Sequence, residues 1–243
     1  MRRHRVSTGV AALGDLVLPV HCGGCGTPGT SWCHRCQAAL AAAPGPQRWV
    51  PTPAPAGLPP VWTVLPYAGP VRTGLVNWKD NGRRDLTDVF APVLTEALLG
   101  ALLACGTEPV VVPAPSGRAN IRRRGDQPLA SLTRSALRRI PTGARPQLVP
   151  VLRLGRAVAD QAGLDSRRRV ANLAGAMTVF PGSTRRLAGL TCLLVDDVIT
   201  TGATIAEAAR ALRAAGARDV LAVTLAATHR QADPPLSFAG EPG

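Results

Sequence analysis

The chain of 243 residues is long enough for one large domain, or for a domain of common size with a small appendage. Apolar residues make up 46%, enough for a substantial core, and an aromatic share of only 3% favours helices packed on a sheet over an all-β sandwich. No uninterrupted run of about 18 apolar residues occurs, so we expect no membrane-spanning helix. Asp15 and Pro19 interrupt the apolar stretch near the N-terminus, which argues against a secretory signal and favours a cytoplasmic protein.

The formal net charge is +13, and Lys79 is the only lysine, so nearly all of the positive charge is carried by arginine. This balance fits a polyanionic partner, either nucleic acid or a phosphate-rich small molecule. It fits equally well a solvated basic surface on a protein from a genome biased toward arginine codons. Charge alone therefore does not decide between the two interpretations.

Four cysteines near the N-terminus form two Cys-x-x-Cys pairs, Cys22 with Cys25 and Cys33 with Cys36. Together they supply four thiolates, the ligand set that suits tetrahedral Zn²⁺, and the segment is too small to fold on a core of its own. We therefore predict a structural zinc site in an N-terminal element spanning residues 1–44.

Disulfide bonds and free thiols remain alternatives to that zinc site. His21 and His34 flank the two pairs and are candidate substitutes for a sulfur ligand. The remaining cysteines, Cys105 and Cys192, lie in apolar segments, so we expect both to be buried and inert.

Beyond the cysteines, residues 37–43 predict a short helix, and the proline-rich residues 45–60 predict an extended, stiff linker. From residue 61 on, strand-like and helix-like segments alternate. The expected strands are residues 61–67, 110–113, 148–152, 190–196 and 220–226, and the expected helices are residues 86–104, 127–138 and 203–215. This alternation predicts an α/β domain over residues 61–230, with an open, mostly parallel sheet flanked by helices, and a disordered tail over residues 231–243.

Residues 190–204 read LTCLLVDDVITTGAT, an apolar strand followed by an acidic pair and a threonine-rich turn into a helix. Gly202 permits a tight turn and close approach to a ligand, and the loop amides at the helix N-terminus suit a phosphate. Asp196 and Asp197 would repel a phosphate, so we expect them to face ribose hydroxyls, a metal ion, or both. The pattern predicts a bound sugar phosphate; a plain strand–turn–helix with a surface acidic pair is the alternative.

This segment resembles the motif by which type I phosphoribosyltransferases bind phosphoribosyl pyrophosphate (PRPP). The resemblance implies the type I fold, Asp196 and Asp197 as catalytic groups on the ribose 2- and 3-hydroxyls, and Mg²⁺ bridging pyrophosphate and ribose oxygens. The implied PRPP-binding residues are Asp196, Asp197, Val198, Thr200, Thr201, Gly202, Ala203 and Thr204. The implied chemistry is displacement of pyrophosphate at the anomeric carbon through an oxocarbenium-like state.

Resemblance to known families also implies ligand-binding roles for two further segments. The arginine-rich loop after the strand at 110–113 corresponds to a pyrophosphate-binding loop, with Ser116, Gly117 and Arg118 at the contact positions. Residues 160–176, DQAGLDSRRRVANLAGA, resemble the "QSGLSRKER..NL.GAF" stretch of the ComF family, which implies a flexible catalytic loop that carries Arg167 and Arg168 over pyrophosphate. A solvated basic helix is the alternative for each segment.

The region around Lys79 also resembles ComF, whose members commonly read "Y.G.....I..LKY.GRRDLA", and a double Cys-x-x-Cys ribbon is typical of that family. Lys79 is thereby a candidate phosphate or substrate contact, beside its interpretation as a surface lysine. The resemblance spans about residues 15–228. Asp80 and Asp126 stand where ComF proteins commonly have aromatic residues, so the resemblance does not imply an acceptor.

Two functions are therefore compatible with the sequence. The first is a PRPP-dependent transferase with an unidentified acceptor. The second is a non-catalytic zinc-ribbon protein that binds single-stranded DNA or the DNA-uptake machinery, because ComF relatives are associated with competence. Against the second, the tryptophans that would stack on bases are dispersed along the chain.

Overall fold

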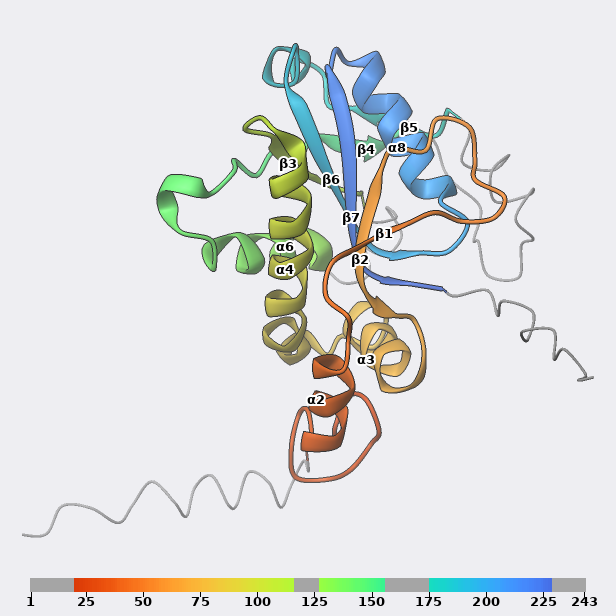
Figure 1. Ribbon diagram of the computed structural model, residues 1–243, viewed down its shortest axis with the longest axis vertical. Helices are drawn as coiled ribbons and strands as arrows, with labels where there is room; N and C mark the ends of the chain where they lie inside the picture. The colour runs from red at the N-terminus through yellow and green to blue at the C-terminus, as the bar shows by residue number, and fades with distance from the viewer. Residues whose placement is uncertain (1–19, 116–126, 156–174, 229–243) are drawn as a thin grey trace, which may run out of the picture.

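The computed structural model describes residues 20–115, 127–155 and 175–228 of the chain. Its centre is a five-stranded sheet with helices on both faces (Figure 1). The strand order is β1 (Gln47–Trp49), β2 (Val61–Pro66), β7 (Asp219–Ala227), β6 (Thr191–Ile199) and β3 (Val110–Pro113). Strands β2, β7, β6 and β3 are mutually parallel, and only the edge strand β1 is antiparallel to its neighbour. The predicted α/β class with a mostly parallel sheet is confirmed.

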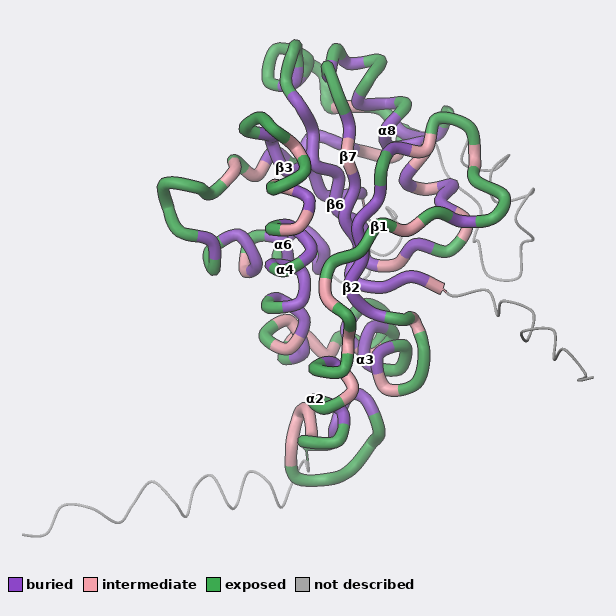
Figure 2. Tube along the Cα trace, viewed as in Figure 1, coloured by how far each residue is buried: buried purple, intermediate pink, exposed green. Residues whose placement is uncertain are grey.

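The central strands are apolar because both faces of the sheet are covered. Helices α4 (Thr87–Cys105) and α6 (Pro128–Arg138) pack on one face. Helix α8 (Ala203–Ala214) packs on the other, beside a small antiparallel sheet of β4 (Leu152–Leu154) and β5 (Met177–Val179). The central strands are accordingly almost wholly buried (Figure 2).

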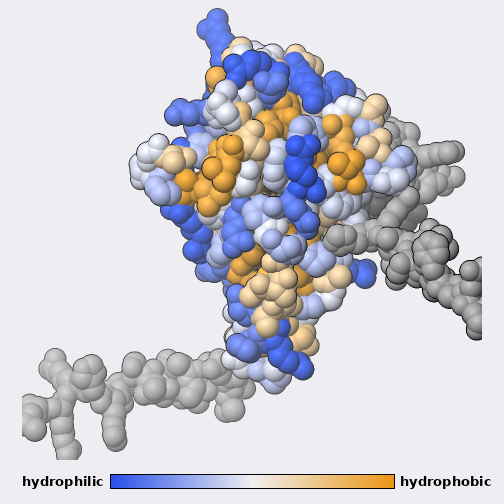
Figure 3. Space-filling model, viewed as in Figure 1, coloured by the Kyte–Doolittle hydropathy of each residue, from blue (hydrophilic) through white to orange (hydrophobic). Residues whose placement is uncertain are grey.

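Within the described ranges, the segment from η1 (Arg84–Leu86) through α4 is long and apolar enough, by length and composition alone, to cross a membrane. The side chains of Phe90, Leu94 and Leu98 are nevertheless fully buried inside the domain. Exposed apolar residues on α4 include Leu103, and Figure 3 shows the apolar surface on this side broken into separate patches. Helix α4 therefore packs as a core helix of the α/β domain.

The cysteine-containing segment and its helix α2 (His34–Ala41) lie beyond the carboxyl ends of the parallel strands, next to α3 (Gly69–Lys79) (Figure 1). The Trp32 ring packs edge-on against Phe90 of α4, with ring centroids 5.8 Å apart. A Cβ on Gly74 of α3 would come within 2.8 Å of the Trp32 ring, so glycine permits this close packing.

Several sequence predictions need correction. The strand predicted at 148–152 is wrong: Leu148 forms only an isolated bridge with Val111, and β4 begins at Leu152. Helix α3 and strand β5 were not predicted, and neither were the short turns η2 (Thr142–Ala144) and η3 (Thr184–Arg186). Strand β1 lies within the proline-rich segment and hydrogen-bonds to β2, so part of that segment belongs to the sheet. The predicted tail at 231–243 lies outside the described residues.

Candidate functional site

The acidic pair lies inside β6 rather than after it. The predicted strand ended at residue 196, whereas β6 continues through Val198 to Ile199, which pairs with Ala227 of β7. The continuation has a simple cause, because two β-branched apolar residues follow the acidic pair and extend the ladder. Asp196 and Asp197 are therefore buried at the carboxyl end of the strand, with 8% and 5% of their surface exposed.

The ladder registers show which face of the sheet each aspartate occupies. A Cβ on Gly100 of α4 would lie 3.7 Å from the Trp62 side chain of β2, and the neighbours of Trp62 along the ladder are Val223 and then Val195. Side chains alternate along a strand, so Asp197 lies on the α4 face with Val195, and Asp196 lies on the α8 face. The two carboxylates thus have different surroundings.

Asp197 is paired with the chain's single lysine. The Nζ of Lys79, the last residue of α3, lies 2.5 Å from Oδ2 of Asp197. Burial raises the pKa of Asp197, but the positive charge and the hydrogen bond of Lys79 lower it by a larger amount. The pKa of Asp197 is therefore below its ordinary value. Partial desolvation lowers the pKa of Lys79, whose side chain is about half exposed, but the charges of Asp197 and Asp196 raise it above its ordinary value. At neutral pH this is an ion pair.

At Asp196, by contrast, the charge of Lys79 does not outweigh the effect of burial on the pKa. Burial and the neighbouring negative charge of Asp197 raise its pKa to about 8, although Lys79 partly offsets this effect. The Oδ1 atom of Asp196 accepts a hydrogen bond of 2.9 Å from the backbone N–H of Asp197. Near neutral pH the pair therefore holds one proton, and it can release that proton when a ligand that prefers the ionised form binds.

The segment after β6 turns directly into α8. Gly202 is the N-cap of α8 and has φ +77°, in the left-handed region that glycine adopts without strain. Thr200 is exposed, and the hydroxyl of Thr201 accepts a hydrogen bond of 3.4 Å from the N–H of Ala203. Val198 and Thr204 are partly exposed beside them. Only residues 200–202 separate the end of β6 from the first turn of α8, whose backbone N–H groups suit an anion.

The proline-rich segment covers one side of this turn. A Cβ on Gly202 would lie 3.0 Å from Leu58 and 3.3 Å from Pro55. Arg213 of α8 also donates a hydrogen bond of 2.8 Å to the carbonyl oxygen of Gly57. Composition predicted a linker here, and no sequence signal indicated this contact with the turn.

Five predicted site residues lie outside the described residues. These are Ser116, Gly117 and Arg118 of the expected pyrophosphate loop, and Arg167 and Arg168 of the expected flexible loop. The carboxyl end of β3 does lie next to β6, because Pro113 pairs with Val195.

The four N-terminal cysteines come together as the sequence predicted. Their sulfur atoms all lie within 4.8 Å of one another, with 3.6 Å between Cys22 and Cys36 and 3.5 Å between Cys25 and Cys33. Tetrahedral Zn²⁺ with bonds of about 2.3 Å places its sulfur ligands about 3.8 Å apart, so the cluster fits this ion. His21 and His34 are not part of the cluster. The four cysteines are therefore positioned to bind a metal ion.

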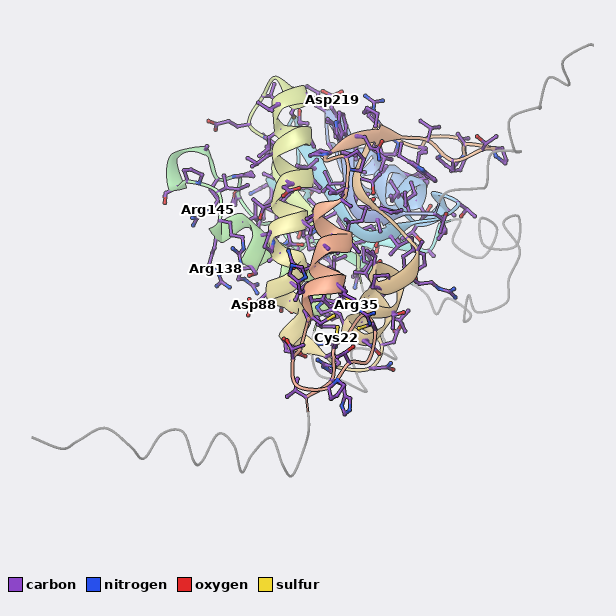
Figure 4. All side chains as sticks on the ribbon, turned by 60° about the horizontal axis from the view of Figure 1, so that its bottom comes forward. Cys22, Arg35, Asp88, Arg138, Arg145 and Asp219 are labelled. Carbon is purple, nitrogen blue, oxygen red and sulfur yellow. The ribbon has the colours of Figure 1, made fainter. Side chains whose placement is uncertain are left out.

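Electrostatics favour the thiolate form in part of this cluster. Hydrogen bonds from the hydroxyl and backbone of Thr27, together with Cys33, lower the pKa of Cys25 to about 5. Burial raises the pKa of Cys22, but backbone N–H groups, including that of Cys33, lower it below its ordinary value. Arg35 lies beside Cys25, and Figure 4 shows it near Cys22 at the end of the molecule formed by this segment. Donor groups around the sulfurs stabilise the charged form that a metal requires.

The prediction that the other two cysteines are buried is confirmed for Cys192 and wrong for Cys105. Cys192 is buried in β6, and burial raises its pKa to about 11. Cys105 is partly exposed because it is the last residue of α4, directly before the left-handed Gly106 that ends the helix.

The C-terminal part of the chain matches a known protein family. Residues 143–239, which include β6 and α8, match the family model described as the phosphoribosyl transferase domain. The fold and this match together define an α/β protein with a phosphoribosyltransferase-type domain. The match covers less than half of the chain.

Curated relatives agree over short segments. The chain is 43% identical over 74 residues to a ribose-phosphate pyrophosphokinase of Parasynechococcus marenigrum, covering 30% of this chain and 20% of that protein. It is 46% identical over 59 residues to ribose-phosphate pyrophosphokinase 2 of Enterococcus faecalis, covering 24% and 17%. A ribose-phosphate pyrophosphokinase of Pasteurella multocida is 44% identical over 70 residues, covering 29% and 20%. The chain thus spans about a fifth of the length of these relatives.

Proposed function

We propose that this chain is a ComF-like phosphoribosyltransferase-domain protein, located in the cytoplasm, that binds PRPP together with Mg²⁺. It would transfer the phosphoribosyl group to or from an acceptor that is not identified. One observation carries the proposal: the buried pair Asp196 and Asp197 near the end of β6 is followed by a short turn into the glycine-capped N-terminus of α8. Hydrogen-bond acceptors for a diol are therefore followed, a few residues later, by donors for a phosphate.

In this proposal the ribose ring lies over the carboxyl end of β6. Ionised Asp196 and Asp197 accept hydrogen bonds from the 2- and 3-hydroxyls. The backbone N–H groups and hydroxyls of residues 200–204 donate to the 5′-phosphate. Such contacts at both ends of the sugar fix the orientation of the anomeric carbon.

The reaction breaks the bond between the anomeric carbon and a pyrophosphate oxygen. Pyrophosphate leaves with the bonding electrons, and a nucleophile of the acceptor donates an electron pair to the same carbon and loses its proton. The acidic pair lies close to the positive charge that develops on the ring, and that charge is stabilised by carboxylates. Mg²⁺, when bound, would neutralise charge on the pyrophosphate, and buried carboxylates are oxygen ligands of the kind that this ion takes.

The cysteine cluster is assigned to structural Zn²⁺ in the same proposal. None of the six cysteines, all of which lie within the described residues, forms a disulfide, and four of them have the spacing that the ion requires. Zinc bound there would hold together a segment that has little core of its own.

The similarity to ribose-phosphate pyrophosphokinases supports a site for ribose phosphate without fixing the reaction. Titration calorimetry with PRPP and Mg²⁺ tests the proposal, with ribose 5-phosphate and pyrophosphate titrated separately. We expect PRPP binding that is lost in the double variant Asp196→Asn/Asp197→Asn and kept in Asp219→Asn, an exposed aspartate at the opposite end of the parallel strands. Absence of PRPP binding by folded, zinc-loaded protein would refute the proposal.

Single-stranded DNA is a second candidate ligand, supported by the net charge of +13 and by the cysteine cluster. A role in DNA uptake and competence belongs to this candidate. If DNA binds through phosphate contacts, its affinity measured by fluorescence anisotropy will fall steeply as salt is raised. Retention of that affinity in the double aspartate variant would separate DNA binding from the PRPP site.

A further inference from the structure

We propose that Lys79 is a positioning residue for Asp197, and that metal binding at the four cysteines fixes the place of its ammonium group. The inference concerns a link between two parts of the molecule, the cysteine cluster and the acidic pair. It is carried by hydrogen bonds and packing that connect the cluster to the segment from α3 to η1.

The first step is the anchoring of Lys79 itself. Its neighbour Trp78 is 1% exposed, packs edge-on against Phe90 with ring centroids 6.4 Å apart, and donates a hydrogen bond of 3.1 Å to the hydroxyl of Thr87. The carbonyl oxygen of Trp78 accepts a hydrogen bond from Arg84. The backbone at Lys79 is thus fixed, and its side chain reaches Asp197 from a fixed base.

The second step is the connection of this base to the first cysteine pair. Asn77 donates a hydrogen bond of 2.8 Å to the carbonyl oxygen of Gly23, which lies between Cys22 and Cys25. Arg83, just beyond α3, donates one of 2.9 Å to the carbonyl oxygen of His21. Residues on both sides of Lys79 therefore hold the backbone of the same cysteine pair.

Packing strengthens this connection. A Cβ on Gly23 would lie 2.5 Å from Leu86 of η1, and one on Gly24 would lie 3.0 Å from Pro70 of α3. The cysteine pair thus lies directly against the elements that flank Lys79. A change in the fold of the pair would displace them.

The third step is electrostatic. The side chain of Asp197 is only 7% exposed, whereas that of Lys79 is 50% exposed. A buried carboxylate without a cation is strongly unfavourable, so Asp197 depends on Lys79 to stay ionised. Asp196 and Asp80 also lie close enough to act on the charge of Lys79. Displacement of α3 would move the cation away from the pair and leave Asp197 to bind a proton as well.

The sequence provides a specific probe of this link. Lys79 is the only lysine, so an amine-reactive reagent labels Lys79 and the N-terminal amine, and mass spectrometry separates the two. Labelling rates would be measured for zinc-loaded protein, for protein stripped with a chelator, and for reloaded protein. We expect a rise of about tenfold at Lys79 on stripping, as for a fall of one pKa unit, and recovery on reloading. The N-terminal amine serves as the internal reference.

Two variants make the test independent of stripping, which could unfold the segment. Asn77→Ala removes the hydrogen bond to Gly23, whereas Asn81→Ala removes only the bond of 2.8 Å between Asn81 and Asn77. We expect faster labelling of Lys79 in zinc-loaded Asn77→Ala and an unchanged rate in Asn81→Ala. Zinc-loaded Asp197→Asn should label faster at Lys79 than the zinc-loaded wild type, because the largest charge acting on Lys79 is removed. Equal rates in loaded, stripped and Asn77→Ala proteins of unchanged circular dichroism would overturn the inference.

The consequence for ligand binding rests on the proposed function. We expect Asn77→Ala and Lys79→Met to weaken PRPP binding about tenfold or more, and Lys79→Arg to restore part of it, because it keeps the charge. If labelling responds to zinc but no protein binds PRPP, the proposed function fails and the link stands. If all variants bind PRPP like the wild type and labelling does not respond, the link fails and the proposed function stands.

Discussion

Thr224 of β7 lies directly beside Asp196 of β6 in the parallel ladder, and Thr63 of β2 lies beside Thr224 in turn. Residues in register share one face of a sheet, so the three side chains form a row. Both threonines are fully buried, and their hydroxyls have no hydrogen-bond partner within the described ranges. A row of polar groups thus crosses the core and ends at an aspartate of the candidate site.

Thr224→Val tests whether this row costs stability. The substitution keeps the β-branched shape and removes a buried hydroxyl that lacks a partner, so the free energy of unfolding should rise by about 1 kcal/mol. Denaturant titration measures this change. A loss of stability would mean that the hydroxyl is hydrogen-bonded in solution.

Thr133→Val is the matched control. Thr133 is also fully buried, but its hydroxyl donates a hydrogen bond of 2.7 Å to the carbonyl oxygen of Leu129. Its replacement should lower the free energy of unfolding by about 1 kcal/mol, the opposite sign. Stabilisation of both variants would show a general benefit of valine and not an effect of the polar row.

Asp196 should make stability depend on pH. Its pKa is about 8 in the folded chain against an ordinary value of 3.8, so between these values the folded chain binds a proton that the unfolded chain releases. The contribution of Asp196 to the free energy of unfolding is therefore largest below about pH 4. As pH rises from about 4 to about 8, this contribution falls by up to about 1.4 kcal/mol per pH unit.

Asp196→Asn removes this titration. Denaturant unfolding at several pH values should show the stability of the variant rising relative to wild type between about pH 4 and pH 8. Asp219→Asn, at an exposed position, should follow the wild-type profile. A constant difference between Asp196→Asn and wild type across this range would contradict the raised pKa.

The sequence predicted which residues form the acidic pair and the turn better than it predicted their partners in space. Residues 190–204 carry the apolar run, the acidic pair and the glycine turn next to one another, so local sequence was enough to predict the acidic pair and the start of α8. The partner of Asp197 was not predictable in the same way. Lys79 lies 118 positions earlier in the chain, and only the placement of α3 beyond the strand ends brings it to Asp197.

The proline-rich segment and α3 show a second limit. Proline content predicts an extended backbone, which β1 and its neighbours have, but composition does not reveal that Leu58 and Pro55 contact the turn at Gly202. Helix α3 was missed because it begins with Gly-Pro and has a short, weakly amphipathic sequence. Its position depends on Trp78 and Phe90, a tertiary contact that overrides local propensity.

Gly202→Ala tests the contact between the proline-rich segment and the turn. Alanine at φ +77° is strained by about 1–2 kcal/mol, and its Cβ would also press on Leu58 and Pro55. Gly182→Ala is the control, since Gly182 has the same φ of +77° with nothing within 4 Å of its Cβ position. We expect Gly202→Ala to lose about 1 kcal/mol more, measured by denaturant titration. Equal losses of unfolding free energy in the two variants would mean that the proline-rich segment moves aside without destabilising the protein.

The cysteine cluster should bind one metal ion per chain through sulfur alone. The sulfurs lie within 4.8 Å of one another, so we expect elemental analysis to find one Zn²⁺, and Co²⁺ in its place to show the absorption of tetrahedral thiolate coordination. His21→Ala and His34→Ala should keep the full metal content, whereas Cys36→Ala should lose most of it, because Cys36 is a buried member of the cluster. Metal removal should lower the Tm by at least about 5 °C, since the bound ion stabilises only the folded segment. Full metal content in Cys36→Ala, or its loss in either histidine variant, would show that the ligand set is not the four sulfurs.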